Sequence, residues 1–110
     1  MSLCDTAIMR VLQHPPRKNL TLTQVLYALS DPVRLSIVKN LAEDDGKACG
    51  TFCLPVAKST ASHHFRVLRE AGVIEMRSEG TQCINSLRRE DLDARFPGLL
   101  DSILRASDPL

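Results

Sequence analysis

Gly72 separates a segment of helical periodicity from two short extended segments. Before it, Ser59 can cap the first turn of a helix over residues 59–71, and Gly72 can adopt the left-handed conformation that closes a helix. After it, residues 73–77 and 82–87 are rich in β-branched and long side chains and flank a short polar turn. The pattern predicts a helix followed by a β-hairpin.

Apolar residues at helical spacing predict further helices before this unit. Residues 3–12 form one stripe, which ends before consecutive prolines that cannot continue it. Residues 22–29 form a second stripe, and Thr21 has the capping-box spacing to Gln24. Asp31 can cap a third helix, since the proline after it suits the first helical position.

The remaining segments complete a small domain. Residues 49–54 have room for little more than one helical turn, and the polar segment 88–96 is expected to be helical. Residues 99–104 carry the apolar edge of a final helix. We therefore expect one domain over residues 1–110, mainly α with a β-hairpin (α+β), in the order α-α-α-α-α-β-β-α.

The composition favours a cytoplasmic protein with reduced thiols. No run of residues approaches the roughly 20 apolar residues needed to span a bilayer, and the start lacks the features of a secretion signal. Four cysteines at irregular positions do not suggest a disulfide framework. The net charge is +1, but residues 58–89 hold six basic and three acidic side chains, a local excess of +3 that suits a nucleic-acid surface.

The helix after Ser59 has two faces with different chemistry. Ala61, His64, Phe65, Leu68 and Ala71 share one side, which is expected to pack inward. The other side is expected to enter the major groove of DNA, because short hydroxyls near a helix start let the backbone approach base edges. The predicted contacts of this helix are Lys58, Ser59, Thr60, Ser62, His63 and Arg66.

The hairpin predicts a second, weaker contact with DNA. Arg77, Thr81 and Gln82 are placed where they can reach the sugar-phosphate backbone or the minor groove. The hairpin, or wing, has few basic and no aromatic side chains. It is therefore expected to position the protein on DNA rather than to recognise the base sequence. Arg88 and Arg89 are either further phosphate contacts or a solvated charge pair.

The sequence resembles the ArsR/SmtB family of winged helix-turn-helix repressors. The resemblance lies in residues 28–35 (ALSDPVRL), residues 59–74 (STASHHFRVLREAGVI) and the following Glu79-Gly80. It implies a helix-turn-helix over residues 50–72, a wing over residues 73–87, and a dimeric repressor that leaves its operator when an inducer, often a metal or metalloid ion, binds.

Two departures from that family bear on the inducer. The element before the recognition helix is short, with CGTFCL over residues 49–54 where relatives carry a longer Cys-x-Cys segment, and the final helix lacks the histidine of a zinc site. Cys49 and Cys53 share one face if helical, and Cys4 is a candidate third ligand for arsenite or another thiophilic ion. The alternatives are packing residues or a redox switch, and Cys83 is expected to be structural.

Apolar edges at both chain ends predict a homodimer. Segments 1–13 and 99–107 are assigned as dimerisation helices, the alternative being that they complete one subunit's core. A two-fold dimer predicts double-stranded DNA with an inverted repeat as the partner. The rival functions are a winged-helix module for protein contact and a small thiol-redox enzyme, although no catalytic Cys-x-x-Cys spacing is present.

Overall fold

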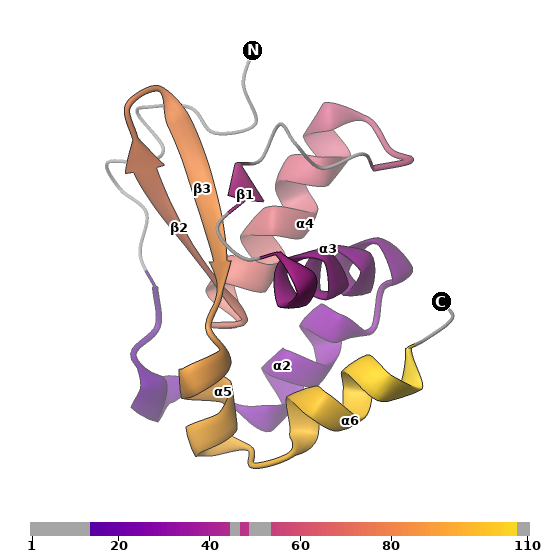
Figure 1. The fold of residues 1–110 in the computed structure, drawn as a ribbon, viewed down its shortest axis with the longest axis vertical. Helices are drawn as coiled ribbons and strands as arrows, with labels where there is room; N and C mark the ends of the chain where they lie inside the picture. The colour runs from indigo at the N-terminus through magenta and orange to yellow at the C-terminus, as the bar shows by residue number, and fades with distance from the viewer. Residues whose placement is uncertain (1–13, 45–46, 49–53, 108–110) are drawn as a thin grey trace.

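The computed structural model describes residues 14–44, 47–48 and 54–107 (Figure 1). Its elements are the 3-10 helix η1 (Arg17–Asn19), α2 (Leu22–Leu29), α3 (Pro32–Glu43), β1 (Lys47–Ala48), α4 (Lys58–Glu70), β2 (Ile74–Glu79), β3 (Gln82–Leu87), α5 (Arg89–Arg95) and α6 (Leu99–Ala106). The predicted helix over 3–12 and most of the predicted turn at 49–54 lie outside the described residues.

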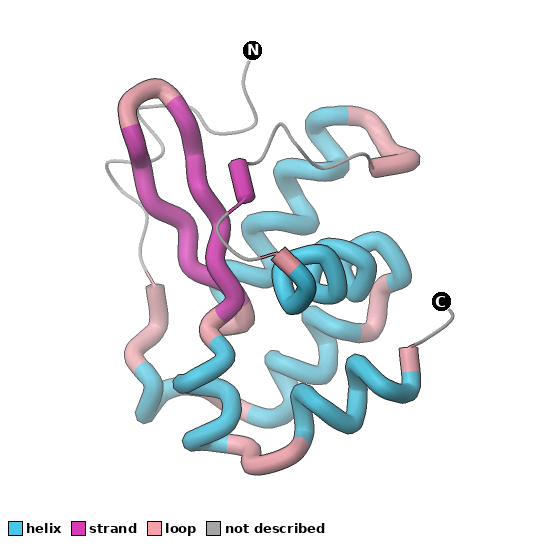
Figure 2. Tube along the Cα trace, in the orientation of Figure 1, coloured by secondary structure: helices cyan, strands magenta, loops and turns pink. Residues whose placement is uncertain are grey.

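The helices gather against one side of the sheet, and the hairpin of β2 and β3 projects from them (Figures 1 and 2). The core lies where α2, α3 and α4 meet. Phe65 and Leu68 of α4 are buried there with Val25 of α2 and Ile37 of α3. The expected mainly α fold with a β-hairpin is confirmed. No helix among the described residues is long and apolar enough to cross a membrane.

The predicted starts of α2 and α3 are confirmed in detail. The hydroxyl of Thr21 accepts a hydrogen bond from the amide of Gln24 (3.4 Å) and donates one to the Gln24 side chain (3.1 Å). A carboxylate oxygen of Asp31 accepts from the amide of Val33 (3.0 Å). These side chains satisfy amides that lack a partner within the helix.

The start of α4 differs from the prediction, whereas its end agrees with it. The helix begins at Lys58 after Ala57, which makes no side-chain cap, so Ser59 lies inside the first turn. At the other end Gly72 has a φ of 84°. The amides of Gly72 and Val73 donate to Arg69 O and Leu68 O, both at 3.0 Å, which is the Schellman arrangement of a helix end.

The sheet has three strands in the order β1-β3-β2, one more than expected. The hairpin pairs Ile74 with Leu87 at its base and Glu79 with Gln82 at its tip. Ala48 of β1 pairs with Ile84 on the other edge of β3. A strand of two residues is too short to show an alternating pattern, which is why the sequence does not reveal it.

The segment before α2 is anchored to the wing and to α5. Nε2 of His14 accepts a hydrogen bond from the amide of Met76 in β2 (3.0 Å). Arg88 donates to the carbonyl of Pro15 (2.8 Å) and Arg95 to that of Leu20 (2.8 Å). These contacts fix the base of the hairpin relative to the helices.

Candidate nucleic-acid interface

The two faces of α4 are arranged as the sequence predicts. Ala61, His64, Phe65, Leu68 and Ala71 are buried. On the opposite face Lys58, Ser59, Thr60, His63 and Arg66 are exposed, and Ser62 is half-buried. The predicted contact residues of this helix therefore lie together on one open surface, which we call the α4 outer face.

The first turn of α4 adds backbone donors to this face. The first amide that bonds within the helix is that of Ala61, which donates to Ala57 O (2.9 Å). The amides of residues 58–60 have no acceptor among the described residues. Uncapped amides at the positive end of a helix dipole favour a phosphate group.

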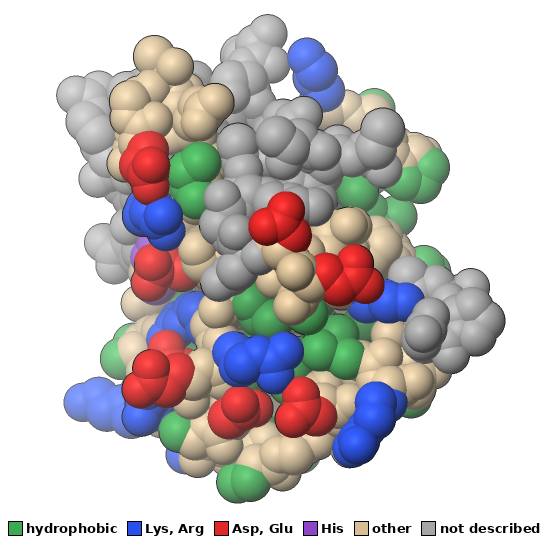
Figure 3. Space-filling view, viewed as in Figure 1, with side chains coloured by type: hydrophobic (Ala, Val, Ile, Leu, Met, Phe, Trp, Pro, Cys, Tyr) green, Lys and Arg blue, Asp and Glu red, His purple; other side chains and the backbone are tan. Residues whose placement is uncertain are grey.

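Most of the basic side chains counted between residues 58 and 89 are engaged within the protein. Arg77, Arg88 and Arg89 pair with Glu79, Asp91 and Asp101 at 2.8–3.0 Å, and Arg69 is buried. Lys58 and Arg66 form no ion pair within the described part of the chain. Over α5 and α6, blue and red side chains lie side by side in Figure 3. The available positive charge of this segment is therefore on the α4 outer face.

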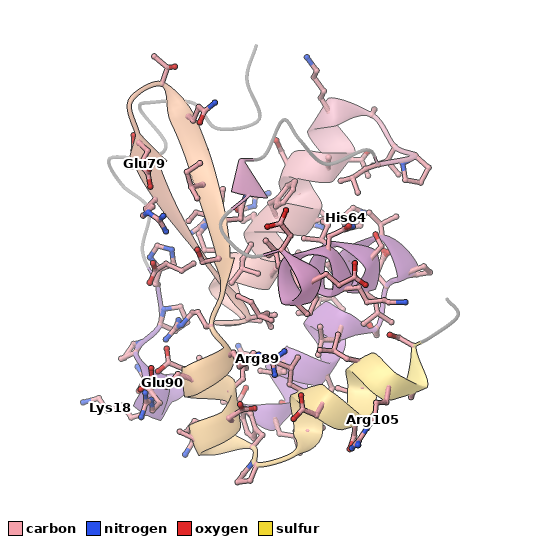
Figure 4. The ribbon with its side chains drawn as sticks, viewed as in Figure 1. Lys18, His64, Glu79, Arg89, Glu90 and Arg105 are labelled. Atoms are coloured by element: carbon pink, nitrogen blue, oxygen red, sulfur yellow. The ribbon has the colours of Figure 1, made fainter. Side chains whose placement is uncertain are left out.

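The wing is exposed but nearly neutral. Arg77 donates to Glu79 (2.9 Å) and to the hydroxyl of Ser86 (3.2 Å), so a phosphate would have to displace the Glu79 carboxylate. Thr81 and Gln82 are exposed beside the turn at Gly80. Glu79 lies along this hairpin in Figure 4. The wing can offer hydrogen bonds and little charge.

His64 holds the inner side of α4. Its Nδ1 lies 3.1 Å from a guanidinium nitrogen of Arg34 in α3, and its Nε2 lies 3.8 Å from a carboxylate oxygen of Asp31 (Figure 4). Burial lowers the pKa of His64 from its ordinary value of 6.5, Arg34 and the neighbouring His63 act in the same direction, and Asp31 opposes them. The expected inward position of His64 is confirmed.

The cysteines depart from the expectation of reduced thiols. Cys83 in β3 is buried and disulfide-bonded. The three candidate ion ligands, Cys4, Cys49 and Cys53, lie outside the described residues, so the predicted thiophilic site stays a prediction. Within the described ranges, no three His, Cys, Asp or Glu side chains are grouped to hold a metal ion.

Three structural contacts at this site are not evident from the sequence. They are the link of Arg34 to His64, the link of His14 to the wing, and the disulfide of Cys83. The first two join residues 30 and 62 positions apart, and periodic helix and strand patterns carry no information about contacts over such separations. The helices α3 and α4, the exposed face of α4 and the hairpin that follows it define a winged helix-turn-helix domain.

Comparison with known proteins agrees with this class. The sequence matches a helix-turn-helix domain family over residues 29–77, from the end of α2 into β2. An uncharacterized HTH-type transcriptional regulator of Bacillus subtilis (strain 168), YceK, is 33% identical over 88 residues, which cover 73% of this chain and 83% of YceK.

Three solved structures share the fold. An ArsR family transcriptional regulator, RHA00566, has a TM-score of 0.61 at 19% identity, covering 74% of this chain and 90% of its own. The transcriptional repressor BigR from Xylella fastidiosa has a TM-score of 0.56 at 28% identity, covering 68% and 85%. A possible transcriptional regulator for arsenical resistance has a TM-score of 0.59 at 28% identity, covering 74% and 84%.

The chain belongs to the HTH-type transcriptional regulators, and it shares the winged helix-turn-helix fold of an ArsR family regulator. The resemblance noted from the sequence is thereby confirmed. The protein is a DNA-binding regulator of transcription rather than an enzyme.

Proposed function

We propose that the protein is a sequence-specific repressor that binds an inverted-repeat operator as a homodimer. The observation that carries this proposal is the α4 outer face, where small hydroxyls, the amides of the first turn and the cations Lys58 and Arg66, which form no ion pair with any described residue, lie together. The name of BigR as a repressor supports the direction of regulation.

Each group on the α4 outer face has a distinct role in this proposal. The amides of the first turn and Lys58 bind a phosphate, which fixes the depth of α4 in the groove. Ser59, Thr60 and Ser62 face base edges, because their small side chains let the helix backbone come close. Arg66 reaches a guanine edge, and His63 lies beside it.

Dimerisation rests on α6 together with the N-terminal residues 1–13. Leu99, Ile103 and Leu104 of α6 are only partly buried in the single chain, and they continue the apolar surface of the core. A second copy packed on this edge would remove them from water. Two-fold symmetry would then place the two α4 helices about 34 Å apart, one turn of DNA.

Sequencing the fragments that the purified protein retains from a random DNA library tests this function. The proposal expects an inverted repeat whose half-site centres are about one helical turn apart. Binding should also weaken steeply with salt, since phosphate contacts release counterions. Retention of no common sequence, with no salt dependence, would instead support a module for protein contact.

We propose two alternative mechanisms of induction, both acting through cysteines: a metalloid route, in which arsenite binds, and a redox route, in which a disulfide is reduced. Arsenite bound by Cys49, Cys53 and Cys4 is one, and the name of the arsenical-resistance regulator among the structural relatives favours it. The disulfide of Cys83 favours a thiol-redox response instead.

Operator release measured with arsenite and with a dithiol reductant separates the two routes. A reductant converts the disulfide to two thiols and is itself oxidised to a disulfide. Release by arsenite that is lost in the Cys49→Ser, Cys53→Ser double variant supports the metalloid route. Release by the reductant alone, lost in Cys83→Ser, supports the redox route, and peptide mapping of the oxidised protein identifies the partner of Cys83.

A further inference from the structure

The guanidinium of Arg34 joins three helices behind the α4 outer face. Arg34 lies on α3 and is buried. Its Nε donates to the carbonyl of Ala28 (2.8 Å) and a terminal nitrogen to that of Tyr27 (3.2 Å), in the last turn of α2. The other terminal nitrogen lies 3.1 Å from Nδ1 of His64 on α4. One side chain thus ties the position of α4 to α2 and α3.

The chemistry of this contact determines which tautomer His64 adopts. An arginine side chain has only donors and stays protonated, so Nδ1 of His64 must be the acceptor. The ring proton then resides on Nε2, which faces the Asp31 carboxylate at 3.8 Å. The arrangement therefore requires a neutral imidazole.

Protonation of His64 would remove this anchor. A protonated Nδ1 would be a hydrogen-bond donor facing another donor, the guanidinium N–H, with the two nitrogens 3.1 Å apart. The imidazolium and the guanidinium would also repel each other, because both carry a positive charge. We propose that Arg34 and His64 are positioning residues for DNA binding, and that protonation of His64 loosens α4 and lowers affinity for DNA. This proposal rests on the repressor function proposed above.

The surrounding charges set the direction of the pH response. The charged groups that face His64 are Asp31 before α3, Arg34 on α3 and His63 on α4 itself, while the ring of Tyr27 from α2 lies under the guanidinium at 5.1 Å. The pKa of His64 is lower in the folded protein than its ordinary value of 6.5. The neutral ring's contribution to the stability of the fold, and with it to the position of α4, is therefore fully present above pH 6.5. This contribution is lost as the pH falls below that value.

DNA affinity measured against pH tests the proposal. Wild-type affinity for the selected DNA should fall as the pH is lowered from about 7.5 to 5.5, because His64 takes up a proton over this range. His64→Asn keeps an oxygen near the position of Nδ1 and does not titrate. It should bind within about threefold of wild type at about pH 7.5 and lose most of the pH dependence.

Two further variants separate positioning from direct contact. His63→Asn removes the exposed histidine of the α4 outer face; whatever its affinity at about pH 7.5, its affinity should still fall towards about pH 5.5, because His64 still titrates. Arg34→Lys keeps the charge but cannot reach α2 and α4 together, so it should bind about tenfold more weakly at about pH 7.5, and the loss should be smaller at about pH 5.5, where the link to His64 is already broken in the wild type. Circular dichroism of each variant confirms that it is folded.

Nitrogen NMR of wild-type His64 gives a test that needs no variant. Nδ1 should be unprotonated at about pH 7.5, and the amide shifts of α4 should follow the titration of His64. A protonated Nδ1, or an unchanged pH dependence of DNA binding in His64→Asn, would overturn the proposal. If the wild type binds no DNA at any pH, the repressor function fails, and the NMR result alone decides whether His64 anchors α4.

Discussion

Gly72 and Leu20 are in such close contact that no side chain fits between them. A Cβ atom on Gly72 would lie 2.1 Å from Cδ2 of Leu20, and the φ of Gly72 is 84°. The contact joins the end of α4 to the segment before α2. It therefore contributes to the placement of α4.

Replacing Gly72 with alanine should destabilise the protein strongly. A left-handed backbone and an overpacked contact each cost on the order of 1–3 kcal/mol, so we expect the free energy of unfolding to fall by about 3 kcal/mol. Gly80→Ala is the matched control, because Gly80 has a φ of 62° but no atom within 4 Å of its Cβ position. Urea denaturation should show the larger loss for Gly72→Ala, and equal losses would contradict the steric account.

His14 should make the stability of the fold depend on pH. Its Nε2 accepts from the amide of Met76, and its pKa is lowered, chiefly by burial and further by Arg69. The neutral ring therefore stabilises the protein above its ordinary pKa of 6.5, and this contribution is lost as the pH falls below that value. His14→Gln retains an acceptor without titrating.

Urea denaturation at several pH values measures this effect. The wild type should lose more stability than His14→Gln between about pH 7.5 and 5.5. His63→Gln, at an exposed position, provides the comparison and should follow the wild type. The same pH dependence in wild type and His14→Gln would show that His14 does not titrate as described.

Asp91 should be the acidic residue that most stabilises the base of the wing. It accepts from Arg17 (2.6 Å) and Arg88 (2.9 Å), and the hydrogen bond from Arg17 is the largest cause of its lowered pKa. This stabilisation is present above the ordinary carboxyl pKa of 3.8 and is lost as the pH falls below it. Asp91→Asn should lower the free energy of unfolding by about 1 kcal/mol.

Glu90→Gln is the control for Asp91. Its side chain is 94% exposed and lies 3.7 Å from Arg17, so its removal should change the thermal midpoint little. A larger loss for Glu90→Gln than for Asp91→Asn in thermal unfolding would refute the assigned role of Asp91.

The sequence predicts regular elements better than contacts between them. Thr21, Asp31 and Gly72 signal their helix ends because capping depends on residues a few positions apart. The predicted start of α4, with Ser59 as its cap, is wrong because the helix begins earlier, at Lys58. Ala57, at the cap position, has no side chain that could identify it as a helix cap.

Some contacts at the candidate site could not be predicted because their partners are far apart in the sequence. Arg34 and His64 are thirty residues apart, and His14 and Met76 are sixty-two apart, so no local periodicity connects them. Arg77 and Glu79, by contrast, are two residues apart on β2 and so point to the same face of the strand, where their ion pair neutralises a cation counted as positive surface. The exposed face of α4 was predictable because helical period alone separates it from Phe65 and Leu68.

Ile103 should contribute to the proposed dimer. It is partly exposed on the apolar edge of α6, where a charge would be costly if a second copy covered it. Ile103→Glu should weaken dimerisation at least tenfold in analytical ultracentrifugation, whereas Ser102→Glu, on the exposed side of the same helix, should leave it unchanged. A wild-type protein that sediments as a monomer at all concentrations would eliminate the dimer.

The most direct test of the DNA-binding surface compares two single cation removals on the selected operator. Arg66→Ala removes a cation from the α4 outer face, and Lys18→Ala removes an exposed cation in η1, far from that face in Figure 4. Fluorescence anisotropy should show a loss of about 1–3 kcal/mol of binding free energy and relaxed base preference for Arg66→Ala. Lys18→Ala should bind as the wild type does, and equal affinities for both variants would contradict the entry of α4 into the groove.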